Sequence, residues 1–139
     1  MNTANSQIGD WLGLPAPATE AEMLCIVEGK LAPTVIKRLI SLGLQRSEVD
    51  KVIIPLRTLQ HRRSRREKLT VEESDRVLRV IGVLALAESV YGSRAHALAW
   101  LRNSHGQLDG RTPLSLLNTD TGRRIVEELL VQIDEGMFV

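Results

Sequence analysis

The sequence that decides the fold is VEESDRVLRVIGVLALAESVY, residues 71–91. Its first half carries several charged residues, and from Val80 to Ala87 it is apolar on nearly every side, with only Gly82 between the larger side chains. A helix of that kind has to be covered by other parts of the protein. The pattern therefore predicts a long buried helix that is either the spine joining two halves of the chain or a contact between two copies.

Helical spacing extends to most of the chain. Apolar residues recur three and four positions apart, and aromatic residues make up only 3% of the sequence, which disfavours a β-rich fold. A polar residue with an acid three positions later marks a helix start at Thr19, Ser47 and Thr70. The predicted fold class is all-α, with helices at residues 19–28, 33–42, 47–53, 56–66, 71–91, 94–103, 113–118 and 120–135.

The ends and the composition limit the environment of the protein. Residues 1–18 contain glycines and prolines and little periodicity, so they are predicted to form a loose arm. The single cysteine excludes an internal disulfide. No charged leader with an apolar stretch begins the chain, and no apolar run approaches the roughly 20 residues that cross a bilayer. We therefore expect a cytoplasmic protein without a membrane partner.

The highest density of charge lies at residues 57–68, which contain six basic residues and one acid, Glu67. The net charge of the whole chain is only +1. This segment follows a short predicted helix and a turn at Pro55, which is the layout of a helix-turn-helix that places its second helix in the major groove of DNA. With Leu56 and Leu59 facing the core, the candidates for contacts with base edges and phosphates are Arg57, Thr58, Gln60 and His61 for bases and Arg62, Arg63, Arg65 and Arg66 for phosphates. The alternative is a solvated face or a surface for an acidic partner.

No catalytic or metal site is predicted. His61, His96 and His105 stand alone, without a cysteine or histidine at the spacing that zinc ligands need. The sequence has no glycine loop for phosphate and no nucleophile paired with a base. We expect no catalytic residues, no metal and no cofactor, which disfavours a small hydrolase or transferase.

The C-terminal part carries an ordered series of motifs. They are Trp100-Leu101, Leu-x-Gly-x-x-Pro at 108–113, Leu-Leu-x-Thr-x-x-Gly at 116–122, and Ile-x-x-Gly at 133–136. This combination resembles the toxin-binding domain of Xre/MbcA/ParS antitoxins. The stretches IPLRTL at 54–59 and LTVEESDR at 69–76 are similar to the Xre-like helix-turn-helix region of the same antitoxins.

The resemblance implies a division of the chain and a protein partner. The implied parts are a loose arm at 1–18, an Xre-like helix-turn-helix domain at 19–69, a connecting or dimer helix at 70–92, and a small helical toxin-binding domain at 93–139. The implied partner is a RES-domain toxin, an enzyme that destroys NAD⁺, whose active site the antitoxin covers. The implied toxin-binding residues are Trp100, Glu127, Glu128, Gln132, Asp134, Glu135, Gly136, Met137, Phe138 and Val139.

The charge of the C-terminal segment fits that role independently of the resemblance. From Asp120 to the end there are five acids and two arginines, which suits a cationic pocket for pyrophosphate. Without the resemblance, a frayed tail behind an ordinary acidic helix face explains the same residues.

These features together lead to one expectation with one alternative. We expect a non-enzymatic antitoxin of a type II toxin–antitoxin system that inhibits its toxin and binds operator DNA to repress its own transcription, as a homodimer within a larger complex with the toxin. The alternative is a free-standing helix-turn-helix regulator whose C-terminal domain only dimerises.

Overall fold

The computed structural model describes residues 3–17 and 19–136, and every regular element in this part of the chain is a helix. The all-α fold class is therefore confirmed. In chain order the elements are α1 (Thr3–Leu12), α2 (Glu20–Glu28), α3 (Thr34–Ser41), α4 (Arg46–Val52), α5 (Leu56–Ser64), α6 (Val71–Tyr91), α7 (Arg94–Arg102), the 3₁₀ turns η1 (Gly106–Leu108) and η2 (Leu114–Asn118), and α8 (Asp120–Asp134).

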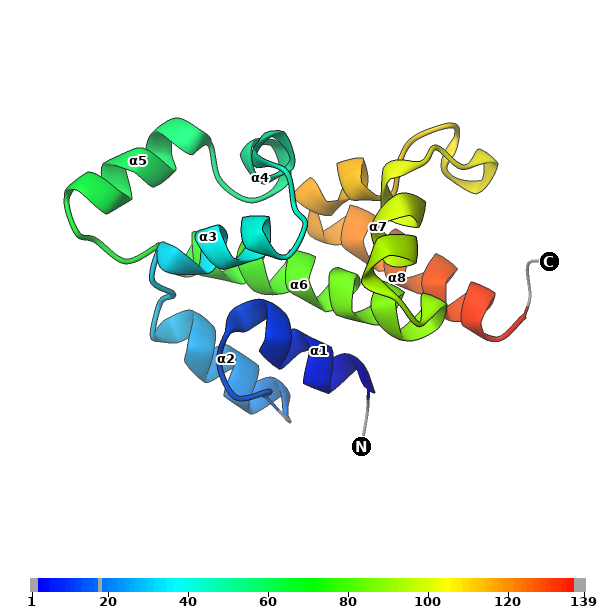
Figure 1. The fold of residues 1–139 in the computed structure, drawn as a ribbon, viewed down its shortest axis with the longest axis horizontal. Helices are drawn as coiled ribbons and strands as arrows, with labels where there is room; N and C mark the ends of the chain where they lie inside the picture. Colours follow the sequence, from blue (N-terminus) through cyan, green and yellow to red (C-terminus); the bar gives the residue numbers. More distant parts are fainter. Residues whose placement is uncertain (1–2, 18, 137–139) are drawn as a thin grey trace.

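Helix α6 is the centre of the fold. It contacts α1, α2, α7, η2 and α8, and Val77, Ile81 and Leu84 on it are at most 1% exposed. Figure 1 shows α6 running across the molecule, with α3 on one side and α1 and α2 on the other. The apolar run that the sequence shows at residues 80–87 is thus covered largely by helices of the same chain.

The start of α6 is fixed by its own sequence. The Thr70 hydroxyl accepts a hydrogen bond from the Glu73 backbone amide at 3.1 Å, and the Glu73 carboxylate accepts one from the Thr70 amide at 2.8 Å. This reciprocal capping box satisfies two amides that the first turn of a helix leaves without partners. The predicted start at residue 71 is therefore confirmed.

The start of α8 depends on close packing at Gly122. The Thr119 hydroxyl caps the helix by accepting a hydrogen bond from the Gly122 amide at 3.0 Å. A Cβ atom at position 122 would lie 1.9 Å from the carbonyl oxygen of Leu116, so only glycine fits there. The Leu-Leu-x-Thr-x-x-Gly motif therefore provides the residues that pack η2 closely against the first turn of α8.

The prediction of a loose arm at the N-terminus is wrong for the described residues before α2. Residues Ile8, Trp11 and Leu12 lie three and four positions apart, form one face of α1, and are at most 8% exposed. That face packs against α3 and α6. Gly13, Pro15 and Pro17 follow α1, and Gly9 lies within it without breaking the helix.

Polar contacts also link α1 to α6 and to α3. The indole Nε1 of Trp11 donates a hydrogen bond to the buried carboxylate of Glu88 on α6. The Arg94 guanidinium lies 3.4 Å from the same carboxylate and 4.9 Å from the centre of the Trp11 ring. On α3, the Arg38 Nε donates to the carbonyl oxygen of Asp10 at 2.6 Å.

We predict that Trp11→Ala lowers the free energy of unfolding by about 3–5 kcal/mol, because it removes a large buried side chain and leaves Glu88 without one of its partners. Leu14→Ala is the matched control, since Leu14 is 46% exposed in the same N-terminal segment. Urea unfolding followed by circular dichroism measures both. Equal, small effects of the two substitutions would mean that the N-terminal segment does not pack as described.

Candidate functional site

Helices α4 and α5 form a helix-turn-helix unit whose turn is held from several directions. Ile53 and Ile54 in the turn are each 1% exposed. The Asp50 carboxylate accepts a hydrogen bond from the Leu56 amide at 2.9 Å, and Arg76 on α6 donates one to the carbonyl oxygen of Ile53 at 2.9 Å. The orientation of α5 is thus set by contacts with both α4 and α6.

The predicted cap of α4 at Ser47 and Asp50 is wrong. The capping box is formed by Gln45 and Glu48, and α4 begins at Arg46. Two capping pairs with the same spacing overlap in this stretch, and the fold uses Asp50 at the start of α5 instead. The sequence spacing alone does not distinguish between these two arrangements.

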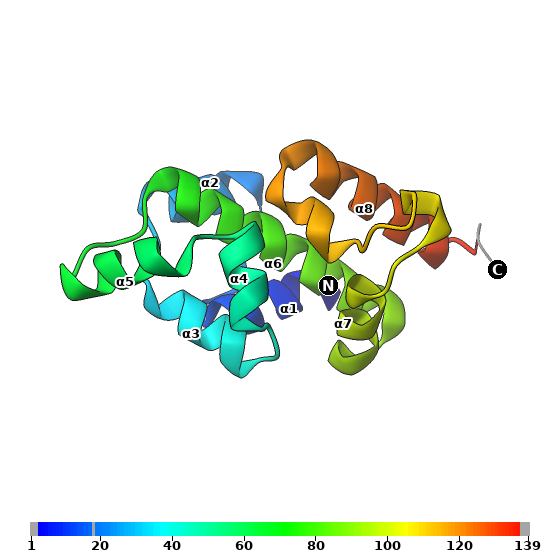
Figure 2. The ribbon, with the colours of Figure 1, turned by 90° about the horizontal axis from the view of Figure 1, so that it is seen from above.

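Helix α5 presents most of the predicted DNA-contacting residues to solvent. Leu59 is buried and Leu56 is half-buried, as the sequence predicted for the face toward the core. Figure 2 shows α5 at one end of the molecule and the last turn of α8 near the other. The exposed candidates are Arg57, Gln60, His61, Arg63, Arg65 and Arg66, and Thr58 is half-buried.

Arg62 is the exception among these arginines. Its Nε and Nη2 atoms lie 3.2 and 3.1 Å from the two carboxylate oxygens of Glu73, and its Nη1 atom lies 3.4 Å from Glu67. Burial by itself would raise the pKa of the Glu73 carboxyl, but the hydrogen bonds from Arg62 and from the Thr70 backbone hold that pKa below its usual value. Arg62 therefore ties the last turn of α5 to the first turn of α6.

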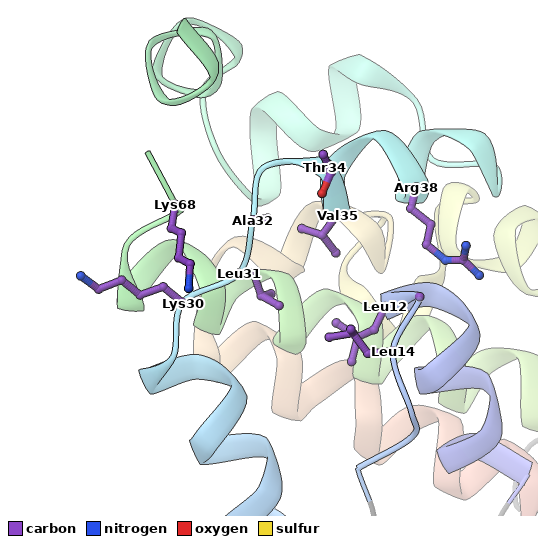
Figure 3. Close-up of a pocket in the computed structure, with 10 residues that line it drawn as sticks. Leu12, Leu14, Lys30, Leu31, Ala32, Thr34, Val35, Arg38 and Lys68 are labelled. Atoms are coloured by element: carbon purple, nitrogen blue, oxygen red, sulfur yellow. The ribbon is translucent and has the colours of Figure 1, made fainter. Parts of the chain in front are cut away.

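Further basic side chains, outside the predicted DNA-contacting residues, lie beside this unit. Lys30, Arg38 and Lys68 line a pocket of about 430 Å³ that has no acidic residue among its lining residues. Figure 3 shows Lys30 and Lys68 on the same side of this pocket, below the end of α5. Because Lys30 precedes α3 and Lys68 follows α5, only the fold brings these two lysines together.

The C-terminal half carries an aromatic cluster. The ring of Trp100 lies 6.0 Å from the ring of Tyr91 and 5.0 Å from that of His105, measured between ring centres. His105 Nε2 is 2.9 Å from the carbonyl oxygen of Trp100. Trp100 is half-buried, so this candidate toxin-binding residue packs in the cluster and is partly accessible to solvent.

One face of helix α8 is buried, and its exposed surface carries both acidic and apolar side chains. Val126 and Leu130 are fully buried, whereas Ile125 and Val131 are 45% and 44% exposed. Glu127 is paired with Arg123 at 2.8 Å. The other described candidates at this end are Glu128, Asp134, Glu135 and Gly136, which are exposed, and Gln132, which is half-buried. The candidates Met137, Phe138 and Val139 lie outside the described residues.

A bidentate ion pair joins the two halves. Arg102 at the end of α7 places its Nε 2.8 Å and its Nη2 2.9 Å from the carboxylate oxygens of Glu48 on α4, and Nη2 also donates to the carbonyl oxygen of Gly43 at 2.7 Å. Burial would raise the pKa of Glu48, but the hydrogen bonds from Arg102 and the Gln45 backbone hold it below its usual value. These contacts therefore hold α7, in the C-terminal half, against α4, the first helix of the helix-turn-helix unit.

The described residues contain neither a candidate metal site nor a candidate membrane span. No group of three or more histidine, cysteine or acidic side chains could hold a metal ion in residues 3–17 and 19–136. In the same ranges, no helix is long and apolar enough to cross a membrane.

Comparison with known proteins decides the family. The helix-turn-helix domain of Xre-like antitoxins matches residues 26–82, and the C-terminal toxin-binding domain of Xre/MbcA/ParS antitoxins matches residues 86–136. Antitoxin Xre of Pseudomonas putida is 38% identical over 125 residues, which are 90% of this chain and 79% of that protein. The chain belongs to the Xre/MbcA/ParS antitoxin family.

Two further Xre antitoxins match a shorter stretch of this chain. Antitoxin Xre of Yersinia enterocolitica is 35% identical over 86 residues, 61% of this chain and 58% of that protein. Antitoxin Xre of Photorhabdus laumondii is 31% identical over 85 residues, 60% of this chain and 57% of that protein. The resemblance inferred from the sequence motifs is therefore confirmed. In the present chain, the basic helix α5 lies in the matched helix-turn-helix domain and α8 lies in the matched toxin-binding domain.

We predict that Arg102→Ala lowers the free energy of unfolding at pH 7 by about 1.5–3 kcal/mol, because Glu48 loses its charged hydrogen-bond partner. The Glu48 pKa is depressed in the folded protein. Its contribution is therefore complete above the unfolded glutamate pKa of about 4.3 and is lost as pH falls through the lower folded value. In urea unfolding experiments, the difference in the free energy of unfolding between wild type and Arg102→Ala should be smaller at pH 3 than at pH 7.

Arg124→Ala is the control for this experiment, because Arg124 is 66% exposed and pairs with an exposed Asp120 on its own helix. We expect it to change stability little at either pH. A pH-independent loss for Arg102→Ala would show that packing, and not the ion pair, is responsible.

Proposed function

We propose that this chain is the antitoxin of a type II toxin–antitoxin pair that inhibits a RES-domain, NAD⁺-degrading toxin by covering its active site. In the same proposal it binds its own operator as a homodimer within a larger toxin–antitoxin complex in the cytoplasm, and so represses transcription. No residue of the chain is assigned a catalytic role. The observation that carries the proposal is the tandem match of a helix-turn-helix domain and a toxin-binding domain to one chain.

The exposed cations of α5 support the DNA-binding part of the proposal. Arg57, Thr58, Gln60 and His61 lie toward the beginning of the second helix of the unit, where such helices contact base edges. Arg63, Arg65 and Arg66 follow on the last turn and just after it, at positions suited to phosphates. Arg62 was predicted to contact phosphate as well, but its pairing with Glu73 and Glu67 supports a positioning role for it instead.

We predict different salt dependences for two neighbouring arginines. If Arg63 contacts a phosphate, Arg63→Ala lowers the slope of log affinity against log salt concentration by about 0.9, because one fewer counterion is released. Arg62→Ala leaves that slope near the wild-type value and lowers the melting temperature, because it breaks the tie between α5 and α6. Operator binding measured between about 50 and 200 mM salt separates the two. An unchanged slope for Arg63→Ala contradicts its assignment to phosphate.

The acidic and apolar character of α8 and of the sequence that follows supports the toxin-binding part. Exposed carboxylates at Glu128, Asp134 and Glu135 suit a positively charged mouth that accepts a dinucleotide. In the proposal, Met137, Phe138 and Val139 enter that mouth, where an aromatic and two aliphatic side chains fill the nucleoside space. Trp100, Glu127, Gln132 and Gly136 contribute to the surrounding contact.

We predict that deletion of residues 137–139 leaves operator binding and the melting temperature unchanged and weakens neutralisation of the toxin. The three residues follow α8 in the sequence, and the buried residues of that helix are Gly122, Val126, Leu129 and Leu130. Co-expression with the toxin and measurement of cell survival tests this. Full protection by the truncated chain would exclude the tail from the inhibitory contact.

The whole proposal is tested by co-purification with the product of the neighbouring gene, followed by measurement of NAD⁺ loss with and without this chain. We expect a stable complex and suppression of NAD⁺ loss. Operator binding without any neighbouring toxin, or without complex formation, would favour the free-standing regulator.

A further inference from the structure

A groove of about 560 Å³ lies between α2, α6 and α8. Its apolar part includes Leu78, Gly82 and Leu86, which lie four residues apart and so form one stripe along α6. Leu24 on α2 stands at its edge and is 57% exposed. Leu78, Gly82 and Leu86 are half-buried, so this stripe remains partly open to solvent in the described chain.

Gly82 in the middle of the stripe has no local explanation. Glycine inside a helix costs about 0.5–1 kcal/mol relative to alanine. A Cβ atom at this position would meet nothing within 4 Å, so no neighbour in the described chain requires its absence. A glycine at the floor of an apolar groove allows close approach by a group from outside the chain.

The charges around the groove indicate what kind of group that is. The lining includes the acids Glu20, Asp75, Asp120 and Glu127 and the bases Arg79 and Arg123. Both bases are already paired with acids of this lining, Arg79 with Asp75 at 3.2 Å and Arg123 with Asp120 at 2.8 Å. The excess is acidic, so two copies packed groove to groove would set like charges against each other, whereas a cationic partner complements the groove.

The groove is continuous with the helix that carries the proposed toxin contacts. Glu127 lines it and also lines the neighbouring hollow on α8 with Glu128, Val131 and Gln132. Helix α8 lies within the residues that match the toxin-binding domain, whereas Leu24 lies outside both matched ranges. One edge of the groove therefore belongs to the matched toxin-binding domain, and the other lies N-terminal to both matched domains.

We propose that this groove binds a positively charged segment of the toxin whose apolar side chains pack over Gly82, as a second contact besides the C-terminal tail. The inference rests on the proposed function, since it takes the toxin as the partner. It gives the N-terminal helices a part in selecting the toxin.

Filling the groove tests the proposal. Gly82→Trp places a large side chain over the floor and is expected to weaken binding of the purified toxin encoded beside this chain by at least about tenfold, equivalent to about 1.4 kcal/mol. Gly82→Ala adds only a methyl group at the same position and should weaken binding much less than Gly82→Trp, with an equal or higher melting temperature. Operator binding and thermal unfolding report on the fold of both variants.

A second pair of variants tests the edge and the charge without touching the floor. Leu24→Ala removes an exposed side chain and is expected to weaken toxin binding by up to about tenfold. Glu20→Lys should weaken it also, whereas Glu72→Lys should not. Both glutamates are exposed in the first turn of a helix, so the reversal costs each helix the same, but only Glu20 lines the groove.

Three results would overturn the inference. Toxin affinity that is unchanged in the folded Gly82→Trp and Leu24→Ala variants excludes the groove from the contact. If the groove variants lose self-association in light scattering but keep their affinity for the toxin, the groove is an interface between copies of this chain. Absence of toxin binding by the wild-type chain removes the proposed function itself, and with it this inference.

Discussion

The burial of one helix that is apolar on nearly every side governs this structure. Val77, Ile81 and Leu84 of α6 are inaccessible to solvent only because α1, α2, α7 and α8 pack around them. Apolar area removed from water stabilises at roughly 25 cal/mol per Å², and a helix with apolar residues on all sides gains this only when every side is covered. The parts of the chain that match the helix-turn-helix domain and the toxin-binding domain are therefore built on a common core and are not two independently folded domains joined by a linker.

Polar contacts then set how the surrounding helices are oriented on that core. Packing of apolar side chains is poorly directional, whereas a bidentate pair between a guanidinium and a carboxylate fixes both distance and plane. Arg102 with Glu48 holds α4 against α7, and Arg62 with Glu73 holds α5 against α6. In the proposed function these two pairs determine the direction in which α5 meets DNA, although neither arginine touches it.

The charge distribution gives the molecule opposite electrostatic ends. The basic helix α5 and the acidic end of α8 lie at different ends of the fold, and the net charge of +1 hides this separation. Separation keeps the two sets of charges from neutralising each other across the roughly 8–10 Å over which salt screens exposed charges. The same chain can therefore present one surface to a polyanion and another to a cationic protein.

The sequence by itself determined the all-α class, the start of α6 and α8, the basic helix and the family, because each depends on residues a few positions apart. Capping boxes, helical spacing and charge clusters are local, and the motif order from Trp100 to Gly136 is specific. Tertiary structure alone decided that Trp11 reaches Glu88, that Arg62 is engaged internally, and that α6 leaves a groove at Gly82. These depend on which distant side chains meet once the helices pack, and the periodicity of a single helix shows which face is buried but not what lies against it.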